Sequence, residues 1–230
     1  MQLSKRLLAI ASEVPENVSV ADVGCDHAYT SIYLAEHKKL KHIIAMDVRT
    51  GPLKKAKENI KASGLEAIIE TRLSDGLQGV VPGEINAVVV SGMGGALIQK
   101  ILTEGKSVVE SVDYLVLQPQ TEKAELRRYL HSIGMKIEKE VMLIEDGKYY
   151  NIITAVRGKD LIYSEEEYEF GHYLLSSKDA VLYEFLQIEL EKVQKILLNL
   201  EHFREKNETR IYQLEVKRRL IMDGLDYFSR

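Results

Sequence analysis

Several residue types are scarce in this chain of 230 residues, and each scarcity excludes a class of protein. There is no Trp and only one Cys, so no internal disulfide forms, which fits the reducing cytoplasm. Positive charge is not in excess, because the formal net charge is −4, and any contact with nucleic acid must use a local patch. No apolar run approaches the ~20 residues of a membrane span. We therefore expect a cytoplasmic protein outside the membrane.

The stretch VADVGCDHAY, residues 20–29, organises the rest of the chain. It predicts a short apolar strand, a tight turn at Gly24 and a helix from Ala28 to about residue 38. A strand, a glycine turn and a helix N-terminus suit a nucleotide-like ligand, because the helix end offers unpaired backbone N–H groups. The pattern G-x-G-x-x-G is incomplete, since Asp26 stands where its second glycine belongs.

Acidic residues stand at the ends of two further predicted strands. Asp47 ends strand 42–48 about 20 residues after the glycine turn, where a doubly wound fold places an acid for a ribose hydroxyl. The alternative is an acid that simply ends a strand. Strand 67–77 ends in Ser74-Asp75-Gly76, which is placed to meet an adenine amino group, although Asp-Gly is also an ordinary turn signal.

A glycine-rich loop follows the fourth predicted strand, within residues 84–102. The strand is almost wholly apolar, as expected for a parallel strand that is covered on both faces. The loop Ser91-Gly92-Met93-Gly94-Gly95 then precedes a helix. Its glycines allow a flat ligand to approach the backbone, whereas loop flexibility is the alternative explanation.

Strand and helix alternate five times before a terminal hairpin around Glu145–Lys148. This order predicts a mostly parallel seven-stranded sheet with an antiparallel edge. A dehydrogenase that binds nicotinamide normally continues with parallel strands. The order therefore favours an α/β fold of the Rossmann-like type found in S-adenosylmethionine-dependent methyltransferases.

The composition changes near residue 161, and we expect a domain boundary there. Residues 165–230 contain no Pro, and their apolar residues follow helical spacing. We predict a Rossmann-like domain over residues 1–160 and a helical, coiled-coil-like appendage over residues 161–230. The core of the appendage is expected to be two long antiparallel helices.

Basic residues concentrate in two predicted helical segments. Lys and Arg outnumber Glu across residues 192–219. This basic segment either contacts RNA phosphate or forms a solvated helix face or a dimer contact, and the sequence supports the two interpretations about equally. The amphipathic helix predicted over residues 3–13 either touches phosphate or only packs on the first strand. The predicted RNA-contacting residues are Lys5, Arg6, Lys217, Arg218 and Arg219.

Seven motifs occur together in this chain: LSKRL, DVGCDHAY, AMDV, SDGL, SGMGG, LQPQ and EDGKYY. With these motifs in this order, the chain resembles the bacterial tRNA (adenine-22-N1)-methyltransferase family over nearly its whole length. The resemblance implies S-adenosylmethionine as methyl donor, tRNA as substrate, and a helical appendage that helps to hold the tRNA.

The resemblance also implies a cofactor pocket. The turn at Gly24 would admit the methionine part, Asp47 the ribose, and Asp75 or its neighbours the adenine. Many amino-methylating enzymes of this fold carry Asn or Asp before Pro-Pro and an aromatic residue, but SGMGG stands here, so that account of base binding does not transfer. The implied cofactor-binding residues are Asp22, Gly24, Asp26, Asp47, Asp75, Gly92 and Gly94.

For methylation at N1, alignment of the base with the methyl group and exclusion of water would supply most of the catalytic effect. The target adenine must leave its stack, and an acceptor for its 6-amino group would stabilise the positive charge on the base. The candidate catalytic residues are Asp26, His27, Tyr29 and Met93, with Tyr29 and Met93 suited to packing on the base. For His27 and Tyr29, the alternative is that they cap and pack the first helix.

Other chemistries lack support in the sequence. Methylation of a pyrimidine carbon needs a Cys nucleophile at the base, whereas Cys25 lies in the cofactor turn. The six His residues are scattered, so we expect no metal site. Two alternatives remain: a methyltransferase for a small molecule or protein that dimerises through the appendage, and a non-catalytic nucleotide-binding partner protein. The oligomeric state is open, and a monomer fits the sequence.

Overall fold

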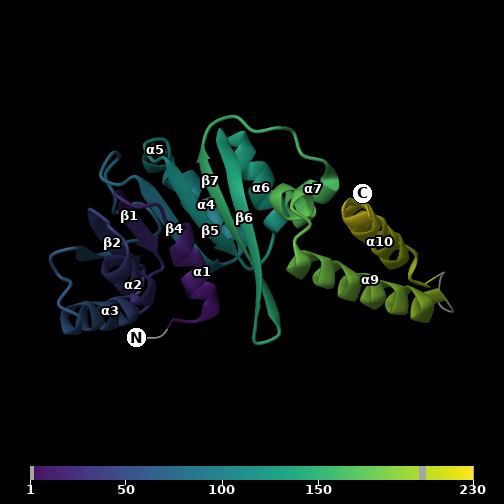
Figure 1. Ribbon diagram of the computed structural model, residues 1–230, viewed down its shortest axis with the longest axis horizontal. Helices are drawn as coiled ribbons and strands as arrows, with labels where there is room; N and C mark the ends of the chain where they lie inside the picture. The colour runs from purple at the N-terminus through teal and green to yellow at the C-terminus, as the bar shows by residue number, and fades with distance from the viewer. Residues whose placement is uncertain (1–2, 202–205, 230) are drawn as a thin grey trace. The chain divides into compact units, whose positions relative to one another are not determined.

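The computed structural model describes residues 3–201 and 206–229, and the chain forms two compact units (Figure 1). The first unit comprises Met1–Val141 and Tyr150–Asp160, and the second comprises Met142–Tyr149 and Leu161–Arg230. One junction between the two units follows Asp160. The tip of the terminal hairpin, however, belongs to the helical unit.

The first unit is built on a seven-stranded sheet with strand order β3-β2-β1-β4-β5-β7-β6. Strands β1 to β5 pair in parallel, and β7 pairs antiparallel with β5. The predicted mostly parallel sheet with an antiparallel edge is therefore confirmed. The strands are β1 (Ser19–Val23), β2 (His42–Asp47), β3 (Ile69–Leu73), β4 (Ala87–Met93), β5 (Tyr114–Pro119), β6 (Met135–Glu145) and β7 (Lys148–Arg157).

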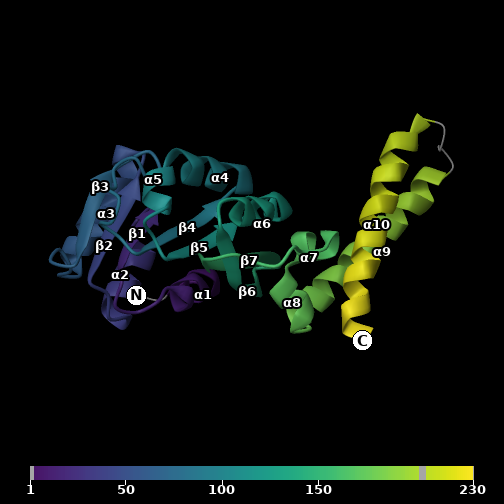
Figure 2. The ribbon, with the colours of Figure 1, turned by 90° about the horizontal axis from the view of Figure 1, so that it is seen from above.

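Helices cover both faces of this sheet, which explains why its central strands are so apolar. Figure 2 shows α1 and α2 on one face and α4 and α6 on the other. Val88, Val89 and Val90 of β4 are fully buried between these layers. The helices of this unit are α1 (Lys5–Glu13), α2 (Tyr29–His37), α3 (Thr50–Ala62), α4 (Gly95–Glu104), α5 (Lys106–Val109) and α6 (Lys123–Ser132).

The strand β4 is longer than the sequence suggested. Ser91–Met93 was expected in a loop, but β4 continues to Met93, which pairs with Pro119 of β5. The register shifts between Ser91 and Met93, so Gly92 forms a β-bulge with φ of 75°. Glycine tolerates this left-handed conformation, which allows the pairing to resume one residue later.

The second unit is helical and closes around its own hydrophobic core. Its two long helices, α9 (Ala180–Glu201) and α10 (Glu208–Ser229), pack side by side, and α7 (Glu165–Phe170) and α8 (His172–Ser176) precede them. The hairpin tip contributes Met142 to this core. The other buried members are Phe170, Leu174, Leu175, Leu182, Leu186, Val193, Leu214 and Ile221.

We predict that Gly95→Ala destabilises the protein whereas Gly51→Ala does not. A Cβ at Gly95 would lie 2.6 Å from the backbone oxygens of both Thr121 and Glu122, so the start of α4 must shift. We expect the free energy of unfolding in urea to fall by about 1–3 kcal/mol. A Cβ at Gly51 meets nothing within 4 Å, and this control should change stability by less than about 1 kcal/mol. Equal effects of the two changes would contradict the close approach at Gly95.

Candidate active site

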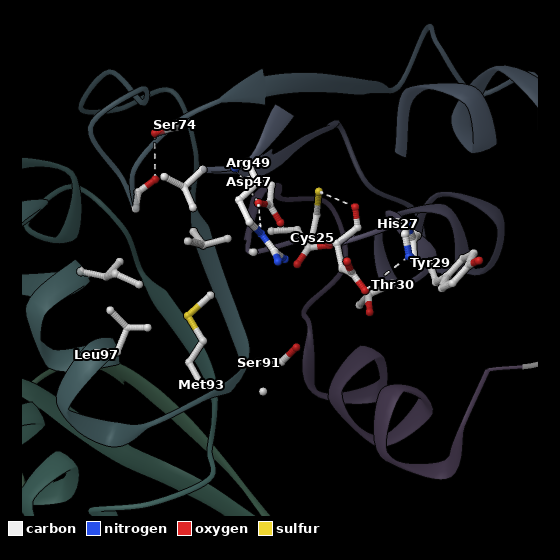
Figure 3. A pocket seen from close by; sticks show the side chains of 18 of the residues that line it. Cys25, His27, Tyr29, Thr30, Asp47, Arg49, Ser74, Ser91, Met93 and Leu97 are labelled. Atoms are coloured by element: carbon white, nitrogen blue, oxygen red, sulfur yellow. Dashed lines mark hydrogen bonds and ion pairs between the residues drawn. The ribbon is translucent and has the colours of Figure 1, made fainter. Parts of the chain in front are cut away.

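A cavity of about 500 Å³ opens at the carboxyl ends of β1, β2, β3 and β4 (Figure 3). Ligands of open α/β sheets bind at this edge, where consecutive strands diverge to opposite helical layers. Many of the residues singled out in the sequence meet here. They are Arg6, Asp22, Gly24, Asp26, His27, Tyr29, Asp47, Asp75, Gly92 and Met93.

The turn after β1 depends on Gly24. Its φ is +74°, and the N–H groups of Gly24 and Cys25 both donate to the carbonyl of Met46, at 2.8 Å each. A Cβ on Gly24 would overlap the terminal methyl group of Met93. The absence of a side chain at Gly24 therefore leaves room for the end of the Met93 side chain, which comes from β4. Figure 3 shows Met93 and Cys25 at the same cavity.

The residues after this turn have unusual backbone conformations. Asp26 and Ala28 both have positive φ, at 51° and 60°, which non-glycine residues rarely adopt. His27 between them is held from α3, because the side-chain amide of Asn59 donates to its carbonyl at 3.0 Å. The ring of His27 lies 5.6 Å from that of Tyr29, and its Nδ1 is buried without a hydrogen-bond partner in the described structure.

The N-terminus of α2 borders the cavity and lacks a side-chain cap. Its N-cap residue, Ala28, makes no side-chain hydrogen bond, so no capping oxygen occupies the first-turn N–H groups at Tyr29 and Thr30. The positive end of the helix dipole points the same way. This end of the cavity is therefore suited to a carboxylate.

A buried acid lies beside this helix end. Asp22 is 3% exposed, and its Oδ2 accepts a 2.6 Å hydrogen bond from the Ser31 hydroxyl. Burial raises the pKa of Asp22 to about 6, although the hydrogen bonds from Ser31 act in the opposite direction. A cationic group placed in the cavity would favour the charged form of this carboxyl.

A second acid lies at the end of β2. The Asp47 side chain is 5% exposed, and its Oδ1 accepts the Arg49 backbone N–H at 2.8 Å. Asp75 follows β3 and is exposed, within a turn that Ser74 fixes by bonding to Gly76 and Gly79. Asp47 and Asp75 both line the cavity, at adjacent strand ends.

Apolar side chains that the sequence reading missed complete the lining. Val48 is 59% exposed and Leu97 is 47% exposed, and both line the cavity, as does Ile101. Exposed apolar groups at a cavity suit the flat face of a base. Helical spacing could have identified Leu97 and Ile101, because residues four apart on α4 share a face. Gln120 also lines the cavity.

Some predicted residues lie elsewhere. Lys5 and Gly94 are outside the cavity lining, and Gly94 is instead the N-cap of α4. Lys217, Arg218 and Arg219 belong to α10 of the second unit, and residues 202–205 of the basic segment 192–219 are outside the described residues.

The thiol of Cys25 is a poor nucleophile in this setting. It is buried, and burial together with the charges of Asp22, Asp47 and Asp26 raises its pKa well above the usual range. Within residues 3–201 and 206–229, no three His, Cys, Asp or Glu side chains group as ligands for a metal ion. No helix in the same ranges is long and apolar enough to cross a membrane.

The family model of tRNA (adenine(22)-N(1))-methyltransferase matches residues 20–221. The chain belongs to this family. A Bacillus subtilis protein named tRNA (adenine(22)-N(1))-methyltransferase is 32% identical over 234 residues, covering 99% of this chain and 98% of the relative. These matches confirm the resemblance that the seven motifs carried.

Solved structures agree with this assignment. A Streptococcus pneumoniae structure, described as a putative tRNA (m1A22) methyltransferase in complex with S-adenosyl-L-methionine, is 33% identical with a TM-score of 0.88 and covers 97% of this chain and 100% of that chain. A structure of the M. capricolum family member in complex with S-adenosyl-homocysteine is 28% identical with a TM-score of 0.87, covering 99% of both chains. The fold and the methyltransferase class are thus confirmed.

We predict a distinctive pH dependence for Asp22→Asn. Because the folded-state pKa of Asp22, about 6, lies above the unfolded value near 3.8, its protonated form stabilises the fold below pH 4. That contribution is lost as pH rises through 6. The unfolding free energy of the wild type, relative to D22N, should fall by about 2 kcal/mol between pH 4 and pH 7. Urea unfolding at several pH values measures this, and a flat or rising difference would contradict the buried carboxyl.

Proposed function

We propose that this protein transfers the methyl group of S-adenosylmethionine to N1 of adenine 22 in tRNA, in the cytoplasm. Membership of the tRNA (adenine(22)-N(1))-methyltransferase family carries the reaction class. The single structural observation that supports it best is the cavity, which gathers the glycine turn, two buried acids and an uncapped helix end at one edge of the sheet.

The residues of the cavity fit the cofactor. A volume of about 500 Å³ lies in the ~300–1,000 Å³ range of small-molecule sites. The uncapped N-terminus of α2 suits the methionine carboxylate, and Asp22 suits the amino group. Asp47 is placed for the ribose hydroxyls, and Val48 and Asp75 for the face and amino group of the adenine.

When bound, this cofactor supplies an activated methyl group on a sulfonium. The chain then has to hold the target base with N1 directed at that methyl and keep water out. Tyr29 and Met93 both border the cavity and are suited to packing on the flipped adenine. The Asp26 carboxylate, whose side chain is 62% exposed, is suited to accept a hydrogen bond from the 6-amino group.

The His27 ring is placed to act through Asp26. Its Nε2 lies 3.8 Å from the Asp26 Oδ2, and the Asn59 amide holds the backbone of His27 from α3. As positive charge develops on the methylated base, a nearby carboxylate lowers its energy. We therefore assign Asp26 to the base and His27 to holding Asp26.

We assign the contacts with tRNA phosphate to basic residues of both units. Arg6 lines the cavity. On α10, Lys217 pairs with Glu189 of α9 at 2.7 Å and Arg218 pairs with Glu215 at 2.6 Å. In the described part of the chain, Arg219 has no such ion pair, so its charge is the most available of the three for RNA.

The direct test is incubation of the purified protein with labelled S-adenosylmethionine and unmodified bacterial tRNA, followed by mapping of the methylated base. We expect one N1-methyladenine at position 22 and no label on tRNA in which that adenine is replaced by guanine. Asp47→Asn should weaken cofactor binding by about tenfold, because one of two charged acceptor oxygens for the ribose hydroxyls becomes an NH2 donor. Label on no tRNA, or on a small molecule or protein instead, would overturn the proposal.

We expect Arg219→Gln to weaken tRNA binding, and Lys217→Gln serves as the matched control. Neutralising one phosphate contact should lower the slope of log affinity against log salt by about one unit. The Lys217 ammonium is held by Glu189, which also pairs with Lys192, so K217Q should change that slope less than R219Q does and chiefly loosen the contact between α9 and α10. Fluorescence anisotropy at several salt concentrations measures both variants. Identical slopes for R219Q and the wild type would exclude Arg219 from the RNA contact.

A further inference from the structure

The β-bulge at Gly92 is fixed by a side chain from the neighbouring strand. Ser91 pairs with Gln118 and Met93 with Pro119, so Gly92 has no partner residue of its own on β5. Its N–H instead donates to the side-chain oxygen Oε1 of Gln118, at 3.1 Å. Bulges often redirect side chains beside active sites, and this one carries Met93 to the cavity.

The same oxygen also fixes a cation from the start of the chain. Arg6 of α1 donates from Nη1 to Oε1 of Gln118 at 3.0 Å, although 112 positions separate the two residues. Gln118 is 1% exposed, and its Nε2 donates to the carbonyl of Pro119 at 3.2 Å. A carbonyl oxygen accepts two hydrogen bonds, so the acceptor capacity of this amide is fully used.

Arg6 is held on a second side by an aromatic ring. Its guanidinium carbon lies 5.5 Å from the centroid of Tyr150, within the range of a cation–π contact. A guanidinium carries five N–H donors, and only one is engaged by Gln118. A Cβ on Gly92 would lie 3.6 Å from the Nη1 of Arg6, so the cation lies directly beside the bulge at the cavity.

We propose that Gln118 is a positioning residue for methyl transfer. Its one buried oxygen sets both the Gly92 bulge, which directs Met93 into the cavity, and the Arg6 guanidinium, which binds a phosphate of the substrate RNA near the target adenine. The inference rests on the proposed function. One side chain thereby positions both the cation for the substrate phosphate and Met93, although it does not itself line the cavity.

A buried amide has a physical advantage over an apolar residue at this position. An apolar side chain at residue 118 would leave the N–H of Gly92 and the charge of Arg6 without this acceptor. Arg6 would then be free to turn toward solvent, and the bulge would lose its lateral bond. A charged acceptor, in contrast, would keep both bonds and strengthen the one to Arg6. Glu and Met both lack the Nε2 donor to the Pro119 carbonyl, so the difference between the two variants reports on the acceptor oxygen.

The test compares Gln118→Met with Gln118→Glu in steady-state methylation of tRNA. Met has a similar length without the acceptor oxygen, whereas Glu retains it. We expect Q118M to lower kcat/KM for tRNA by about tenfold, mainly through KM, and Q118E to stay within about threefold of the wild type. The affinity for S-adenosylmethionine by calorimetry should be unchanged within about twofold, because Gln118 lies outside the cofactor lining.

Thr154→Val controls for a change of a buried polar residue in the same sheet. Thr154 lies on β7, pairs with Val116 and is outside the cavity lining, and its hydroxyl has no hydrogen-bond partner in the described structure. Its kcat/KM should equal that of the wild type even if its melting temperature changes. A loss in T154V as large as that in Q118M would reduce Gln118 to a structural role and overturn the proposal.

Arg6→Met tests the same bond from the other end, at a partly exposed position where folding is not at risk. R6M should raise the KM for tRNA by no more than Q118M does, because R6M leaves the bond to Gly92 intact, and the double variant should lose no more than Q118M alone. Independent losses that multiply, equal losses in Q118M and Q118E, or an unchanged KM in R6M would each overturn the proposal. A wild-type protein that binds S-adenosylmethionine but methylates no tRNA would overturn the proposed function as well.

Discussion

Parallel pairing of β1 with both β2 and β4 is the constraint on which the rest of the structure depends. Val23 pairs with Met46 on one side and with Val90 on the other, so the three strands end at the same edge of the sheet. The helices that follow leave toward opposite faces, which opens a cavity at that edge. Asp22, Asp47 and Met93 therefore meet, although they are distant in sequence. Gly24 suits the turn because L residues with a side chain rarely adopt its φ of +74°, and a Cβ there would also displace the terminal methyl group of Met93.

The cavity combines rigid and strained parts in a way that suits its proposed chemistry. The floor is buried sheet, whereas the turn at Asp26–Ala28 has a left-handed backbone at two non-glycine residues. Strain of this kind persists only where the surrounding structure fixes it, here through Asn59 and the start of α2. The groups assigned to the base thus lie on a fixed turn, and catalysis by alignment requires that rigidity.

Much of this fold is readable from the sequence because the signals are local. The alternation of strands and helices predicted a mostly parallel sheet with an antiparallel edge. Asp47 and Asp75, at the ends of predicted strands, indicated the edge of the sheet at which the cavity lies. What could not be read depends on distant pairing. The contact of Arg6 with Gln118 joins residues 112 positions apart, and the bulge at Gly92 shows only once β4 is paired with β5. The hairpin tip joins the helical unit through packing of Met142, which no periodicity reveals.

The central claim is that one edge of the sheet holds both the methyl donor and the target adenine. A crystal structure of this protein with S-adenosylhomocysteine and a tRNA fragment containing adenine 22 tests it most directly. We expect the ribose of the cofactor product on Asp47, and the flipped adenine between Tyr29 and Met93 with N1 facing the sulfur. An adenine bound outside this cavity, or a cofactor product away from Asp47, would contradict the account.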